Sequence, residues 1–82
     1  MTTEEIKDFK KKLHEGIVEF KYNKINGEER TTRGTLLETT ITEDGGSMPK
    51  GVMEVSDETI RYYDLNSNGW RSFRTENFIK II

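Results

Sequence analysis

The feature that most constrains the fold is a change in hydrophobic periodicity at Gly16. Before Gly16 the apolar residues recur at helical spacing, whereas Val18, Phe20 and Tyr22 alternate with charged residues after it. Such alternation is typical of a strand with one buried face. The chain has 82 residues and no cysteine, so it has room for one core and no disulfide to stabilise it. We therefore expect a single domain over residues 1–82 that joins one helix to a compact sheet.

The N-terminal segment carries the signals of a helix over residues 3–15. Thr2 and Glu5 have the spacing of a capping box, and Thr3 is the alternative N-cap. One face of this helix is apolar (Ile6, Phe9 and Leu13), and we expect it to cover the sheet. Gly16 is expected to end the helix in a left-handed conformation.

Turn signals divide residues 17–82 into short strands. Asn26-Gly27 predicts a hairpin between strands at 17–22 and 28–37, and Asn66–Gly69 predicts another between strands at 59–64 and 69–74. A single helical turn capped by Thr75 is expected before a last strand at 78–82. Residues 38–51 are predicted to form a long loop, either a partner-recognition element or a flexible tether, with a brief strand at Val52–Val55 after it.

This order of elements predicts a mainly β fold. Five short strands on so small a core favour a strongly bent sheet that closes on itself. We expect a small five-stranded SH3-like or Sm-like barrel, with one N-terminal α-helix and a 3₁₀ turn before the last strand. The barrel should occupy residues 17–82.

Composition excludes several classes of function. The formal net charge of −2 and the pI of about 5.4 argue against a general nucleic-acid coat. His14 is the only histidine and cysteine is absent, so neither a multi-histidine nor a thiolate metal site is available. We expect no enzymatic activity, no cofactor and no metal. The charged N-terminus lacks the apolar run of a signal peptide, and no segment is long enough to span a membrane, so we expect a cytoplasmic protein.

The C-terminal half contains a distinctive run of residues. Gly69-Trp70-Arg71-Ser72-Phe73-Arg74 follows Tyr62-Tyr63-Asp64-Leu65 and precedes Phe78-Ile79-Lys80-Ile81. With Arg30–Leu36, this run resembles an uncharacterised phage family of SH3 β-barrel fold-containing proteins over roughly residues 12–82. There is a weaker likeness to the WYL domain, an Sm-like barrel, in which Arg71-Ser72-Phe73-Arg74 matches an R-x-F-R run. The first resemblance implies a phage accessory protein in the host cytoplasm, and the second implies nucleotide or nucleic-acid ligands.

Arginine and aromatic residues on the predicted strands are the candidate binding residues. The arginines could bind a phosphate by bidentate hydrogen bonds, and the aromatic rings could stack on a base. The candidates are Arg30, Arg33, Tyr63, Trp70, Arg71 and Arg74. A second interpretation stays open: the rings pack in the core, and the arginines pair across strands with Asp64, Glu76 or Glu29.

We expect a non-enzymatic binding module that modulates a host process through protein–protein contacts. The alternative is a nucleotide or single-stranded nucleic-acid binding barrel that senses or sequesters its ligand. The apolar strand at the end of the chain (Ile79, Ile81 and Ile82) could pair with a second copy, so a homo-oligomer is also an expectation.

Overall fold

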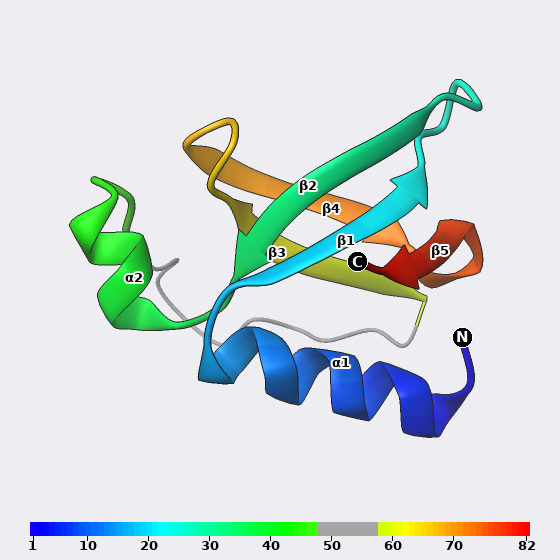
Figure 1. Ribbon diagram of the computed structural model, residues 1–82, viewed down its shortest axis with the longest axis horizontal. Helices are drawn as coiled ribbons and strands as arrows, with labels where there is room; N and C mark the ends of the chain where they lie inside the picture. The colour runs from blue at the N-terminus through cyan, green and yellow to red at the C-terminus, as the bar shows by residue number, and fades with distance from the viewer. Residues whose placement is uncertain (48–57) are drawn as a thin grey trace.

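The computed structural model describes residues 1–47 and 58–82 (Figure 1). Helix α1 spans Thr3–Glu15 and is followed by strands β1 (Val18–Asn23) and β2 (Glu29–Thr35). A short helix, α2, spans Glu38–Glu43. The remaining elements are β3 (Thr59–Asp64), β4 (Gly69–Arg74), the 3₁₀ helix η1 (Thr75–Asn77) and β5 (Phe78–Ile81).

Helix α1 begins at the predicted capping box. The Glu5 backbone N–H donates to the Thr2 hydroxyl at 3.2 Å, and the Thr2 N–H donates to the Glu5 carboxylate at 3.0 Å. The hydrogen bonds from Thr2, first that of its backbone N–H, lower the pKa of Glu5. Both the predicted bounds and the predicted cap of this helix are therefore confirmed.

The prediction for the end of α1 is wrong in one respect. Gly16 has φ 171° and ψ −155°, which is extended rather than left-handed backbone. The chain passes directly into β1, and the helix carbonyls find partners on β2 instead of in a left-handed cap. The Thr35 hydroxyl lies 3.2 Å from the Leu13 carbonyl and 2.8 Å from the Gly16 carbonyl, and the Leu36 N–H donates to Leu13.

The five described strands form one antiparallel sheet in the order β4-β3-β2-β1-β5. In β1 and β2, Phe20 faces Thr32 and Tyr22 faces Arg30, while β3 and β4 are in register from Thr59↔Arg74 to Asp64↔Gly69. The mainly β class and the 3₁₀ turn are confirmed. The sheet is not closed, because β4 and β5 lie at its two ends with no pairing between them in the described part of the chain. The structure therefore does not confirm a barrel.

The core lies between α1 and one face of the sheet, as the apolar helix face predicted (Figure 1). The Phe9 ring meets the Phe20 ring edge-on at a centroid distance of 5.0 Å, and Phe20 meets Tyr62 in the same way at 5.1 Å. The buried hydrophobic residues of this cluster are Ile6, Phe9, Leu13, Val18, Phe20, Tyr22, Leu36, Ile60, Tyr62 and Phe73.

Part of the predicted loop 38–51 is helical, so that prediction is wrong for Glu38–Glu43. No side chain caps α2 at its N-cap Leu37, which explains why the local sequence gives no helix signal. The helix instead buries Ile41 completely. The predicted strand Val52–Val55 lies outside the described residues.

Both predicted hairpins form, with details that the turn signals did not specify. In the first, only Gly27 has a positive φ (90°), and the Asn26 side chain accepts from the Glu28 N–H at 3.0 Å. The predicted cap of η1 is wrong: Arg74 is its N-cap, and the Thr75 hydroxyl donates to the Glu58 carbonyl instead. None of the described helices is sufficiently long and apolar to cross a bilayer.

Candidate functional site

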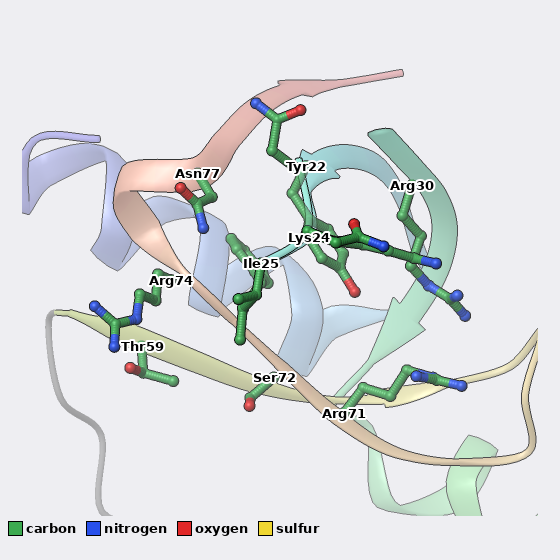
Figure 2. A pocket seen from close by; sticks show the side chains of 12 residues that line it. Tyr22, Lys24, Ile25, Arg30, Thr59, Arg71, Ser72, Arg74 and Asn77 are labelled. Carbon is green, nitrogen blue, oxygen red and sulfur yellow. The ribbon is translucent and has the colours of Figure 1, made fainter. Parts of the chain in front are cut away.

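A groove of about 620 Å³ lies between the β1–β2 hairpin and β4. Among the residues that the structure describes, 12 line this groove; four of them are cationic and none is Asp or Glu, although the whole chain has a net charge of −2. We call this site the basic groove and define it by Lys24, Arg30, Arg71 and Arg74. Arg30 and Arg71 lie toward one end and Arg74 toward the other (Figure 2). The carboxylates of Glu28, Asp64 and Glu76 lie 2.8 to 3.9 Å from these cations, so four cations face three carboxylates and the site keeps a small excess of positive charge.

Asp64 anchors one end of the basic groove. Its side chain is fully buried, and Arg30 Nη2 donates to Asp64 Oδ2 at 2.8 Å. Arg71 Nε lies 3.4 Å from the same oxygen, and the Asn66 backbone N–H donates to Asp64 Oδ1 at 2.8 Å. Ser67 Oγ accepts from both guanidinium groups, at 2.9 Å from Arg30 and 3.1 Å from Arg71. One buried carboxylate and one hydroxyl thus fix two arginines side by side.

The pKa values agree with this geometry. Burial raises the pKa of Asp64, but its hydrogen bonds, led by that from Arg30, outweigh the burial and leave the pKa below its usual range. The hydrogen bond to Asp64 raises the pKa of Arg30. Asp64 and Arg30 therefore keep their charges at neutral pH. The guanidinium of Arg71 adds a second cation against the one anion. The Arg71 side chain is 47% exposed and that of Arg30 is 19% exposed, so Arg71 is the cation that a ligand can reach more easily.

The floor of the basic groove is aromatic. The rings of Tyr22 and Phe73 both line it and stack on each other at a centroid distance of 4.8 Å. The hydroxyls of Tyr22 and Tyr62 are 2.9 Å apart beneath the surface. Burial and this hydrogen bond raise the pKa of Tyr62 far above its usual value. The floor therefore consists of buried core rings, and the charged side chains lie around it.

Three of the six predicted site residues are brought together in the groove: Arg30, Arg71 and Arg74. The interpretation that these arginines pair with acidic neighbours is also confirmed, because Arg30 and Arg71 meet Asp64 while Arg74 Nη1 lies 3.6 Å from Glu76. Pairing does not hide Arg74, whose side chain is 67% exposed. Arg71 and Arg74 therefore keep exposed charge available to a ligand.

The other three predicted residues lie elsewhere. Arg33 is exposed on β2 opposite Glu19, on the other face from Arg30, because side chains three residues apart on a strand point to opposite faces. Tyr63 is buried, and its hydroxyl donates to Asp44 at 2.9 Å. Trp70 packs edge-on against Tyr63, and its indole N–H donates to the Ser47 carbonyl at 3.0 Å. These two rings hold the α2 segment against the sheet and do not face the groove.

Sequence reasoning did not single out the other described lining residues of the groove, among them Lys24 and Ile25. Lys24 and Ile25 lie in the β1–β2 turn, and Ile25 is a large apolar residue that is 95% exposed. An apolar residue directly before the Asn26-Gly27 turn was the only available signal. That the turn lies opposite β4 depends on the tertiary fold.

No candidate metal site is evident in the described ranges. No group of three or more His, Asp or Glu side chains within residues 1–47 and 58–82 is placed to hold a metal ion. His14 is exposed near the end of α1. The cationic side chains that line the groove suit an anionic ligand.

Comparison with known families gives one match. The sequence model of WYL_2, described as an Sm-like SH3 beta-barrel fold, matches residues 6–79. This match confirms the predicted likeness to WYL and Sm-like domains, whereas a phage origin stays a prediction. No curated protein and no solved structure matches the chain.

Proposed function

The chain belongs to the WYL_2 family, whose fold is Sm-like, and from this premise we propose that it is a non-enzymatic binding module for another protein. The observation that carries the proposal is the basic groove, with four cations, no carboxylate among the lining residues within 1–47 and 58–82, and an aromatic floor. A rim of charge around an apolar centre is the usual anatomy of a protein-binding surface. Its ligand would be an acidic region of a partner protein.

The exposed Ile25 favours a protein as the partner. A large apolar side chain at 95% exposure beside a charged groove gains free energy when a partner covers it. Arg71 and Arg74 can each form charge-assisted hydrogen bonds with a carboxylate. The groove therefore offers both an apolar anchor and charge complementarity, the combination that gives protein contacts their affinity and their specificity.

The wider role follows from the resemblance of the Gly69–Arg74 segment. We propose a phage-type accessory protein that acts in the host cytoplasm and modulates a host process through its partner. We also propose that the sheet is a variant of the Sm-like barrel of its family. In this proposal β4 and β5 flank the remaining opening of the barrel, and the groove lies beside β4.

A charge-reversal pair tests the function. Arg74→Glu changes the groove without touching Asp64, while Lys11→Glu makes the same change in net charge on an exposed position of α1. In a pull-down from host lysate, wild type and Lys11→Glu should capture the same protein, and Arg74→Glu should lose most of it. Equal capture by all three proteins would contradict the proposal.

The second candidate is binding of a nucleotide or of single-stranded nucleic acid. The exposed guanidinium groups of Arg71 and Arg74 favour it, because both suit a phosphate. The rings predicted to stack on bases, Tyr63 and Trp70, are however engaged with α2 and the segment after it. Titration with short oligonucleotides and cyclic nucleotides at low salt separates the two candidates, since this one requires salt-dependent binding that Arg74→Glu abolishes.

A further inference from the structure

Strand β4 has one edge without a partner strand in the described part of the chain. It pairs with β3 on one side and ends the sheet order on the other. The Thr75 N–H donates to the Glu58 carbonyl at 3.0 Å, which shows that Glu58 and Thr75 form a hydrogen-bonded pair next to the β3–β4 pairing. In an antiparallel ladder, hydrogen-bonded and non-hydrogen-bonded pairs alternate. With no register shift from Thr59↔Arg74 to Asp64↔Gly69, the main-chain groups of Trp70, Ser72 and Arg74 face away from β3.

This free edge borders the basic groove. Arg71, Ser72, Phe73 and Arg74 all line the groove, and β4 runs along it from the Arg74 end to the Arg71 end (Figure 2). An extended chain in the groove would therefore lie alongside N–H and C=O groups of β4 that have no partner strand within residues 1–47 and 58–82. Unpaired strand edges are templates for the addition of another strand.

The side chains around the edge define the chemistry of the added strand. Arg71 and Arg74 come from β4 itself, and Lys24 and Arg30 lie across the groove. Because side chains alternate along a strand, carboxylates at every second position of a segment lie on one face, where they would meet Arg71 and Arg30. Arg74, three residues after Arg71, lies on the other face of β4 and would meet a carboxylate at an intervening position. Ile25 stands exposed beside the groove, where an apolar residue of the segment would cover it.

We propose that the partner docks as an extended acidic segment that adds a strand to the free edge of β4. This inference rests on the proposed function and specifies how the groove is used. Main-chain hydrogen bonds to Ser72 and its neighbours set the direction and register of the segment, and the cations select its carboxylates. The exposed Ile25 holds one apolar side chain of the segment.

A second copy of this chain is a poor occupant of the same edge. Strand β5 is the other end of the described sheet, and its sequence, Phe-Ile-Lys-Ile, contains no acidic residue. Lys80 would then approach Arg71 or Arg74, and such like-charge contacts disfavour pairing. Charge complementarity therefore favours a different, acidic chain.

The test uses a capped decapeptide of alternating Glu and Val as the probe. The comparison peptide has the same side chains but is N-methylated at its two central residues, which face opposite edges of a strand and so block pairing on either side. On the protein, Ser72→Pro removes one outward N–H at a position where an edge strand tolerates proline, and Ser72→Ala is the matched control. Fluorescence anisotropy of the labelled peptides at low salt gives the dissociation constants.

We expect N-methylation and Ser72→Pro each to weaken binding by about tenfold or more, and Ser72→Ala to change it by less than about twofold. The wild-type comparison of the two peptides stays decisive even if Ser72→Pro fails to fold. Equal binding of both peptides, or no binding of the probe, overturns strand addition. The pull-down tests the proposed function independently of strand addition. The proposed function is supported if Arg74→Glu loses the partner protein, and it is contradicted if Arg74→Glu captures the partner as well as wild type does.

Discussion

Replacing the buried Asp64 by Asn should destabilise the protein by about 3 kcal/mol. Asn keeps the oxygen that accepts from the Asn66 N–H, so the loss is confined to the oxygen that holds Arg30 at 2.8 Å and Arg71 at 3.4 Å. Removing one member of a buried ion pair costs about 3–5 kcal/mol. Arg30 is 19% exposed and still donates to Ser67 Oγ, which places the cost at the lower end.

Urea unfolding followed by the fluorescence of Trp70, the only tryptophan, measures this cost. In a domain of this size, about 3 kcal/mol corresponds to a fall of about 12–24 °C in Tm. The matched control is Asp8→Asn, which breaks the exposed ion pair with Lys12 (3.3 Å) and should cost less than about 0.5 kcal/mol. Similar losses in the two variants would refute the reasoning.

A second substitution separates charge from packing. Asp64→Asn leaves the partly buried Arg30 cation without its carboxylate partner. If this causes the loss of stability, adding Arg30→Gln should recover about 1 kcal/mol or more of the free energy of unfolding, because no buried charge is then left unpaired. If the double variant is no more stable than Asp64→Asn alone, the cost lies in packing, and our account of the network is wrong.

Three further predictions concern stability. The pKa of Asp64 is lower in the folded protein than in the unfolded chain, so the contribution of its ionised carboxylate to stability is complete above about pH 5 and is lost as the pH falls through the folded pKa. Thermal unfolding measured from pH 6 to pH 3 should therefore show a steeper fall in Tm for wild type than for Asp64→Asn. Thr2→Ala removes the hydroxyl of the capping box and should cost about 1 kcal/mol in urea unfolding, and no loss would show that the cap is dispensable. Gly34→Ala places a Cβ 2.5 Å from a Tyr62 ring carbon and should lower the free energy of unfolding by about 1–3 kcal/mol. The control is Gly16→Ala, whose Cβ meets nothing within 4 Å. Equal stability of the two variants would contradict the tight packing at Gly34.

Local signals in the sequence predict the elements whose determinants are local. The capping box at Thr2 fixes the start of α1, and the Asn66–Gly69 turn fixes the strands on either side of it. Helix α2 could not be predicted in this way, because it has no capping side chain and buries only Ile41. Its formation depends on contacts with distant residues, such as the hydrogen bond between Asp44 and Tyr63.

The candidate site also contains residues that the sequence identifies correctly and residues whose role depends on the tertiary fold. Residue type and strand periodicity single out Arg30, Arg71 and Arg74, and the structure brings these three into one groove. Periodicity also gives the two faces of β3 and β4 but does not show which face a later element covers. Tyr63 and Trp70 are therefore predicted as binding residues, whereas the structure engages them in packing and in hydrogen bonds to Asp44 and Ser47.

The charge of the basic groove acts only at close range. The chain carries a net charge of −2, and at physiological ionic strength charges are screened over about 8 Å, so the groove cannot steer a distant acidic partner against the field of the whole protein. Its cations contribute once a partner lies in the groove, where Asp64 and Ser67 already hold Arg30 and Arg71 in place and reduce the entropy lost on binding. Charge-reversing changes such as Arg74→Glu should therefore accelerate dissociation much more than they slow association, which a surface-binding kinetic measurement at two salt concentrations would show.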